Sequence, residues 1–259
     1  MAPTSSVPNA TDSRPLGDVV ISPGLPVDPR ADPALSRLPG MRALARGDWL
    51  VLDGAFAGQM RARDALAGRE GCVIETPGAG PAIAELGEVL REALAGLPGY
   101  AVDCHSVRRP DGVEVMGGDL AALARLSPMD LCLVEPRGGA HVLTAGALLF
   151  PASWTLSEKI GRPLGAIHAP VEPYDAALER RVDRLFDALH AERPLWRMNA
   201  LRYADPALHQ PRGEHARRDR GVPGRWLRCE RQCLLKLART GAAVFSIQTF
   251  VVPWREPQT

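Results

Sequence analysis

Residues 226–252 read WLRCERQCLLKLARTGAAVFSIQTFVV, and this stretch decides the fold class. Two extended runs, 226–237 and 242–252, are separated by the short segment 238–241, and the second run is rich in Val, Ile, Phe and Thr. β-Branched and aromatic residues on either side of a short connection that contains glycine are typical of a β-hairpin. The stretch therefore predicts a long antiparallel hairpin.

Polar side chains interrupt the first run of this hairpin. Glu230, Arg231 and Gln232 are consecutive, so in a strand they place polar groups on both faces. Such groups are costly to bury unless they are paired, which makes them candidates for chemistry. Strand alternation puts Arg231 on the face opposite to Glu230 and Gln232. We therefore expect Arg228, Glu230 and Gln232 to act as a set and Arg231 to be structural, unless a bulge intervenes.

The rest of the chain predicts a mixture of helices and strands, and hence an α+β fold. Helical spacing of apolar residues is clear after Pro81 and after Asp175. Further helices are expected over 59–70 and over 119–136, with an interruption at 127–128. Strands are expected at 72–75, 140–150 and 194–203, and a loop at 205–224. Residues 76–81 form a Gly-rich connection that lacks the residues of a phosphate-binding motif, so an ordinary loop is favoured there.

Composition excludes several classes of protein. The 31 Lys and Arg residues balance 30 Asp and Glu residues, which argues against a nucleic-acid-binding surface. No apolar run reaches 18 residues, so no transmembrane helix is expected. Five cysteines without a secretory signal predict reduced thiols and a cytoplasmic protein. Residues 1–40 are rich in Pro, Ser, Asp and Gly and predict a mobile or loosely docked arm, followed by a single domain over 41–256.

The stretch from Leu149 to Val171 has the richest chemistry. His168 lies two residues before Pro170, and a histidine on such a constrained segment can ligate a metal or a haem iron. From these residues alone, a hydrogen-bonded structural histidine is the favoured alternative. Lys159 is one of only two lysines among the 31 cations, so an ammonium rather than a guanidinium can be required there. It can pair with Glu158, a haem propionate or an acidic substrate, although a solvated charge is the simpler interpretation.

Other catalytic templates are absent from the sequence. It contains no Gly-x-Ser-x-Gly elbow, no His-Glu-x-x-His zinc motif and no Cys-x-x-Cys-His site for covalent haem attachment. Cys104 and His105 are adjacent, but nothing around them indicates an activated thiolate.

Two ordered motifs resemble the haem-dependent oxidative N-demethylase family. The first comprises Phe150-Pro151-x-x-Trp154, Glu158-Lys159-x-Gly161-x-Pro163-Leu164 and Ile167-His168-x-Pro170-Val171. The second runs from Leu227-Arg228-Cys229-Glu230-Arg231-Gln232 to Val244–Phe250. The similarity spans roughly residues 41–254.

The resemblance implies a fold and an activity. It implies a PAS-like antiparallel sheet flanked by helices that encloses haem b, and an oxygen-using oxidation of an amine that releases an N-methyl group as formaldehyde. An external reductase is then expected to supply electrons, because the sequence has no flavin or nicotinamide fingerprint. No nucleic-acid or membrane partner is expected, and homo-oligomerisation is left open.

The resemblance also selects residues. It makes His168 the leading iron ligand, with His141 second and Cys229 third. Expected catalytic residues are Glu230, Arg228, Gln232 and Asn199, and expected haem-binding residues are His168, Lys159, Trp154, Arg197 and Arg231. Three departures matter: the family's Arg-x-Asn-Trp stretch is Arg197-Met198-Asn199-Ala200 here, Glu172 replaces a proline, and Lys236-Leu237-Ala238 replaces Arg-Leu-Pro. Loss of the tryptophan can enlarge a pocket or remove a haem contact, so the substrate can differ. A non-catalytic haem sensor of PAS type, or a haemless pseudoenzyme subunit, is the alternative.

Overall fold

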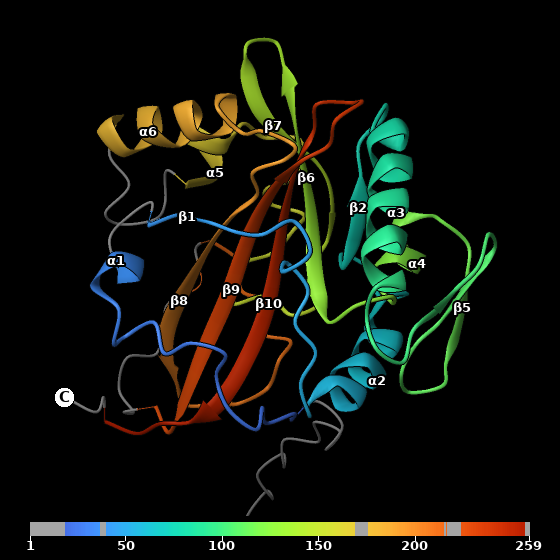
Figure 1. The fold of residues 1–259 in the computed structure, drawn as a ribbon. Helices are drawn as coiled ribbons and strands as arrows, with labels where there is room; N and C mark the ends of the chain where they lie inside the picture. Colours follow the sequence, from blue (N-terminus) through green and yellow to red (C-terminus); the bar gives the residue numbers. More distant parts are fainter. Residues whose placement is uncertain (1–18, 37–39, 169–175, 215, 217–223, 257–259) are drawn as a thin grey trace, which may run out of the picture.

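The computed structural model describes residues 19–36, 40–168, 176–214, 216 and 224–256. Its main element is a seven-stranded antiparallel sheet with the strand order β1-β8-β9-β10-β6-β7-β2 (Figure 1). The strands are β1 (Arg42–Ala43), β2 (Val73–Glu75), β6 (Met129–Arg137), β7 (Ala140–Ala147), β8 (Leu195–Tyr203), β9 (Trp226–Lys236) and β10 (Ala243–Pro253). Together with six helices, the sheet gives a mixed α+β architecture in the described part of the chain.

The predicted hairpin forms the centre of the sheet. β9 and β10 pair along their full length, from Ala243 with Lys236 to Pro253 with Trp226. The other side of β10 pairs with β6, and the other side of β9 pairs with β8. Because β9 and β10 are central, most of their residues are buried, which explains their apolar composition.

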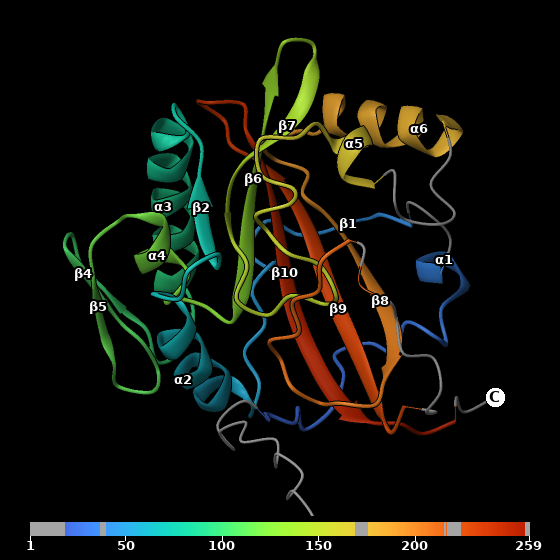
Figure 2. The same cartoon turned by 180° about the vertical axis from the view of Figure 1, so that it is seen from behind.

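Different segments cover the two faces of the sheet. The face that carries Glu230, called the Glu230 face, is covered by residues 148–168, by α5 (Leu164–His168) and α6 (Ala176–Asp187), and by residues 205–214 (Figure 2). The opposite face, called the Cys229 face, is covered over β8–β10 by the segment that contains α1 (Pro33–Ser36). Its other half packs against α2 (Phe56–Leu66) and α3 (Gly80–Ala95).

Most of the predicted elements are confirmed. The helices over 59–70, after Pro81 and after Asp175 correspond to α2, α3 and α6, and the strands at 72–75, 140–150 and 194–203 correspond to β2, β7 and β8. The capping role of Asp175 falls outside the described residues. The Gly-rich connection at 76–81 leads into α3, with Pro81 in its first turn.

The helix predicted over 119–136 is wrong beyond residue 123. Only α4 (Leu120–Leu123) is helical, and Met129–Arg137 is strand β6. The reason is burial on both faces: the first six residues of β6 are all buried, and a strand buried on both faces has the same continuous apolar pattern as a buried helix. A small second sheet was not predicted, and it consists of β3 (Ala101–Val102), β4 (Ser106–Arg108) and β5 (Glu114–Met116).

Ion pairs anchor this small sheet and the start of β6. Arg109 has no exposed side-chain surface and binds the carboxylates of Asp64 and Asp111. Arg63 and Asp130 form a pair with no exposed side-chain surface, and Asp130 also accepts hydrogen bonds from the backbone of Leu149 and Phe150. Asp130 thus fixes the point where the Phe150–Pro151 motif begins.

Part of the segment before residue 41 lies within the described residues. Leu35 is buried against the Cys229 face. The backbone N–H of Ser22 donates to the carbonyl oxygen of Val251 at 2.8 Å. Residues 1–18 and 37–39 lie outside the described part of the chain.

Candidate functional site

A polar cluster with one buried and three half-buried side chains lies on the Glu230 face, where β8 and β9 pair. Arg197 faces Gln232 and Asn199 faces Glu230 in the ladder, so the four side chains share one face. Asn199 Nδ2 and Gln232 Nε2 both donate to Glu230 Oε2, at 3.1 and 3.0 Å. The backbone N–H of Glu230 donates to Asn199 Oδ1 at 2.9 Å. We call these four residues the Glu230 cluster.

Arg197 supplies the positive charge of the cluster. Burial lowers the pKa of its guanidinium, against the opposing charge of Glu230. Its Nε atom is buried and has no hydrogen-bond partner among the described residues. A buried donor without an acceptor is expensive, so an anionic group placed here would gain a ready partner.

Arg228 shares this face but binds the backbone. Its guanidinium donates to the carbonyl oxygens of Leu208 at 2.9 Å, Ala207 at 3.2 Å and Phe150 at 2.6 Å. The side chain is almost fully buried. Arg228 therefore fastens the 150 and 207–208 segments to β9, and no hydrogen bond or ion pair between its side chain and the Glu230 cluster is present among the described residues.

Arg231 lies on the Cys229 face, as strand alternation requires. It donates to the carbonyl oxygens of Trp49 at 3.0 Å and Asp48 at 2.6 Å, and it stacks over the ring of Trp196. The structure does not bring it together with Glu230 or Gln232.

His168 is the last residue of α5, rather than part of an irregular turn. Its Nδ1 lies 2.9 Å from the carbonyl oxygen of Leu164. A carbonyl only accepts, so Nδ1 carries the proton and the lone pair of the neutral ring is on Nε2. Burial outweighs this hydrogen bond and lowers the pKa of His168 below its ordinary value. The lowered pKa favours the neutral imidazole, which is the form that binds a metal.

Lys159 and Trp154 lie in the segment that leads to α5. The Lys159 ammonium is buried and donates to the carbonyl oxygen of Ile167 at 2.9 Å and to Glu214 at 3.2 Å. Trp154 is partly buried and packs against the apolar cluster beneath α5 and α6. Both residues thus support the helix that carries His168.

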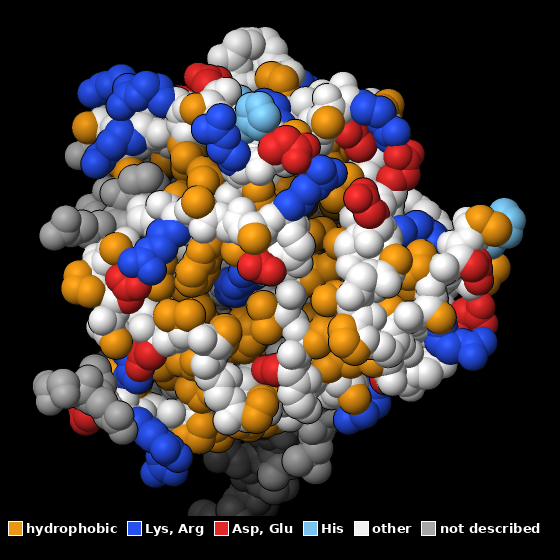
Figure 3. All heavy atoms as spheres, viewed as in Figure 1, with side chains coloured by type: hydrophobic (Ala, Val, Ile, Leu, Met, Phe, Trp, Pro, Cys, Tyr) orange, Lys and Arg blue, Asp and Glu red, His pale blue; other side chains and the backbone are white. Residues whose placement is uncertain are grey.

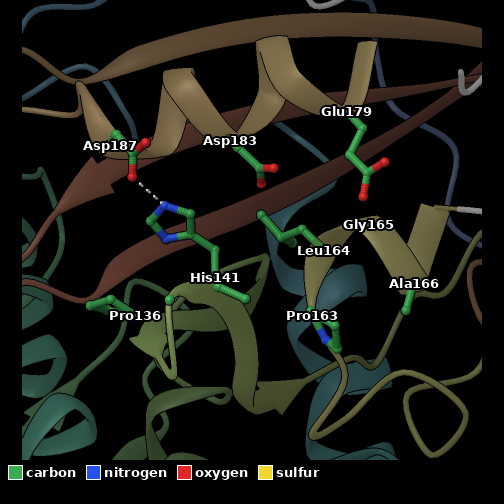
Figure 4. Close-up of a pocket in the computed structure, with 11 residues that line it drawn as sticks. Pro136, His141, Pro163, Leu164, Gly165, Ala166, Glu179, Asp183 and Asp187 are labelled. Carbon is green, nitrogen blue, oxygen red and sulfur yellow. Dashed lines mark hydrogen bonds and ion pairs between the residues drawn. The ribbon is translucent and has the colours of Figure 1, made fainter. Parts of the chain in front are cut away.

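A pocket of about 460 Å³ lies between α5, α6 and β7 (Figure 4). Glu179, Asp183 and Asp187 project from α6 into it, and a Cβ at Gly165 would collide with the Glu179 carboxylate. His141 points into the same space, where its Nε2 lies 2.8 Å from Asp187. Three carboxylates disfavour haem propionates here by like-charge repulsion. His141 thus lies in an acidic pocket, within hydrogen-bond distance of Asp187.

The opposite surface of α6 is basic. Arg180, Arg181 and Arg184 are exposed there, where Figure 3 shows Lys and Arg side chains gathered over the helix. α6 thus presents carboxylates to the pocket and guanidinium groups to the solvent.

Cys229 is sealed in an apolar cluster with Leu35, Met198, Leu227 and Phe250. Burial raises the pKa of its thiol to about 12. Because the thiolate is the metal-binding form, this environment disfavours Cys229 as a ligand.

Ala200, where the resemblance implies a tryptophan, lies on the Cys229 face. Ala200 pairs with Cys229 in the ladder, so it points away from the Glu230 cluster. It lines a hollow of about 250 Å³ between β8 and residues 29–35. A larger side chain at position 200 would therefore meet the N-terminal segment rather than the Glu230 cluster.

Sequence reasoning missed two residues beside His168. Arg162 donates to the carbonyl oxygen of Ala166, and Glu214 binds both Arg162 and Lys159. Arg162 lies between Gly161 and Pro163 in the first family motif, and this position could have identified it as a candidate. Glu214 lies in the polar stretch 205–224, where nothing in the sequence marks it.

The model of the family described as haem-dependent oxidative N-demethylase, alpha subunit-like matches residues 107–259. The chain belongs to this family. No curated protein matches it. The matched region contains strands β6 to β10 together with α5 and α6, and therefore all residues of the Glu230 cluster and His168.

Membership of the haem-dependent oxidative N-demethylase family implies haem and oxidoreductase chemistry, and the family's description as alpha subunit-like suggests further subunits or partners. Among the described residues, no three His, Cys, Asp or Glu side chains gather as a site for a bare metal ion. Iron held in a porphyrin needs only an axial protein ligand, so haem does not require such a group. Within the described part of the chain, no helix is long and apolar enough to cross a membrane.

Proposed function

We propose that this chain binds haem b over residues 41–256 as a single PAS-like domain and oxidises an N-methyl amine. The observation that carries the proposal is a buried carboxylate, Glu230, held by Asn199 and Gln232 beside the guanidinium of Arg197 in a chain of this family. An oxidative N-demethylation consumes the amine, one O₂, two electrons and two protons, and yields the demethylated amine, formaldehyde and water. The electrons come from an external reductase.

The residues fit a haem in their donor chemistry. His168 offers a neutral imidazole whose protonated Nδ1 is bound to a backbone carbonyl, the arrangement that orients most histidine ligands. Arg197 offers a half-buried guanidinium whose buried Nε donor has no partner among the described residues and could bind a propionate. Haem, when bound, supplies the one-electron and oxygen chemistry that no side chain can supply.

The chain's own residues then bind and orient the substrate. The carboxylate of Glu230 attracts a protonated amine, and it is pre-oriented by its two amide donors. Asn199 and Gln232 are neutral, so they hold the carboxylate without neutralising it. Glu230 also provides a proton-accepting oxygen inside the site. Arg228 contributes by fixing the loops at 150 and 207–208.

Absorption spectroscopy of the purified protein tests the proposal. We expect a Soret band in the wild type that is lost or strongly shifted in His168→Ala and retained in His141→Ala. Formaldehyde release from a panel of secondary and tertiary N-methyl amines, with O₂ and a reductase, then tests turnover. We expect Glu230→Gln to keep the Soret band and to lose turnover by about 10²-fold or more.

The outcomes separate the alternatives. A Soret band without turnover on any amine would identify a haem-binding sensor. A protein that binds no haem would be a haemless subunit. A His168→Ala variant with an unchanged Soret band and turnover would remove His168 as the ligand.

A further inference from the structure

The helix that ends at His168, α5, is too short to be stable without contacts to other segments. α5 has five residues, so most of its carbonyl oxygens have no partner within the helix. Two cations that precede it in the chain donate to two of these oxygens. Arg162 Nη2 donates to Ala166 O and Lys159 Nζ donates to Ile167 O, both at 2.9 Å. Cations are favourable at this end of a helix because of its dipole.

A single carboxylate joins the two cations. Glu214 Oε1 lies 3.2 Å from Lys159 Nζ and 3.2 Å from Arg162 Nη1. Glu214 belongs to the connection between β8 and β9, more than 50 residues from either cation. It therefore binds α5 to a distant part of the chain.

Backbone contacts fix Glu214 in turn. Its N–H lies 3.1 and 3.2 Å from the two carboxylate oxygens of Glu158, which also accepts a hydrogen bond from Thr155. Lys159 is buried and the Glu214 side chain is only 19% exposed. Partial burial strengthens this ion pair relative to a surface pair.

We propose that Glu214 is a positioning residue for the His168 imidazole, acting through Lys159 and Arg162. The carboxylate holds the two cations on the carbonyls next to His168, and thereby fixes the end of α5 and the direction of the ring. The functional consequence rests on the proposed role of His168 as iron ligand. The positioning itself does not, because it can be observed on the imidazole without haem.

The test compares Glu214→Gln with the wild type in both states. In the haem-free protein, ¹⁵N-histidine NMR follows the Nδ1–H proton of His168, with His168→Gln identifying the signal. We expect its exchange with solvent to speed up at least about tenfold, because a hydrogen bond weakened by 1.4 kcal/mol opens tenfold more often. In the haem-loaded protein, we expect EPR g-values of the ferric iron to shift or broaden.

Glu85→Gln is the matched control. Glu85 is also a buried carboxylate, and it accepts hydrogen bonds from Arg239 N, Thr240 N and Thr240 Oγ1 at the turn of the hairpin. It should lower the melting temperature without changing either signal of His168. Glu214→Asp, which keeps the charge, should restore part of the wild-type exchange rate.

Wild-type exchange and g-values in Glu214→Gln would overturn the proposal, as would equal changes in Glu85→Gln. Failure of the proposed function has a different signature: His168→Ala would keep its Soret band, while the exchange measurement on the haem-free protein would still decide the role of Glu214.

Discussion

Asn199 and Glu230 face each other across the β8–β9 ladder and are joined twice. The amide of Asn199 donates to the Glu230 carboxylate, and its oxygen accepts the Glu230 backbone N–H. This reciprocal pairing requires one amide with both a donor and an acceptor. An aspartate of the same shape could not donate.

Asn199→Asp should therefore destabilise the protein by about 1–3 kcal/mol at neutral pH. Two carboxylates would then face each other, and one hydrogen bond would become a repulsion. The deficit should shrink in acid, because protonation of the introduced aspartate removes the repulsion and restores a donor. Urea unfolding at several pH values measures it. Asn199→Ala, which loses the hydrogen bonds without adding charge, should show no such recovery.

Thiol reactivity should separate the cysteines sharply. Cys104 is exposed, whereas Cys72, Cys132, Cys229 and Cys233 are buried. Burial raises the pKa of the Cys229 thiol to about 12, so little thiolate is present at neutral pH. In the native protein, we expect one fast-reacting thiol with DTNB and four that react only on unfolding. Cys104→Ser should abolish the fast phase, and rapid labelling of Cys229 in that variant would contradict the packing of the Cys229 face.

The stability contributed by Asp64 should depend on pH. Burial alone would raise its pKa, but hydrogen bonds from Arg109 and Arg125 outweigh this and hold the pKa below its ordinary value. A carboxyl group with a lowered pKa stabilises the fold at neutral pH and loses that contribution as the pH falls below about 4. Asp64→Asn should cost about 1–3 kcal/mol at pH 7. The gap to the wild type, measured by urea unfolding, should close in acid, and a constant gap down to pH 3 would refute the ion-pair origin.

Arg228→Met should be among the most destabilising substitutions of an arginine in this chain. Three buried carbonyl oxygens, those of Phe150, Ala207 and Leu208, would lose their donor. We expect a loss of at least about 2 kcal/mol. Arg108→Met is the control, because its side chain is 64% exposed and its ion pair is long; it should change the stability by less than about 0.5 kcal/mol. Equal effects of the two variants would show that Arg228 does not hold the loops.

The sequence predicted the central hairpin correctly because β-branched and aromatic residues around a short Gly-containing connection are a local signal, and the faces of β9 follow from strand alternation. It misassigned β6, since burial on both faces removes that period. The sequence pattern could not predict which groups Arg228 and Arg231 bind. Strand alternation gives the face of an arginine, but only the tertiary fold reveals that Phe150 O and Trp49 O are the acceptors.

The residues around His168 illustrate the same limit of prediction from the sequence. Lys159 was singled out because lysine is rare in this chain, and the structure shows its ammonium on the carbonyl of Ile167. Glu214 gave no signal, because its importance comes from two partners more than 50 residues away. Sequence patterns report neighbours along the chain, whereas this cluster is built from neighbours in space.

The position of β10 has a kinetic consequence. It is the only strand of the described sheet that pairs with both β9 and β6. β10 therefore connects two parts of the sheet, strands β1, β8 and β9 on one side and strands β6, β7 and β2 on the other. The β9–β10 and β6–β7 hairpins can close early, because their contacts are local. Docking of β10 onto β6 joins residues more than 100 positions apart and has to wait for a costly loop closure. That docking step should limit the folding rate, and substitutions at the β10–β6 ladder should slow folding more than those in either hairpin.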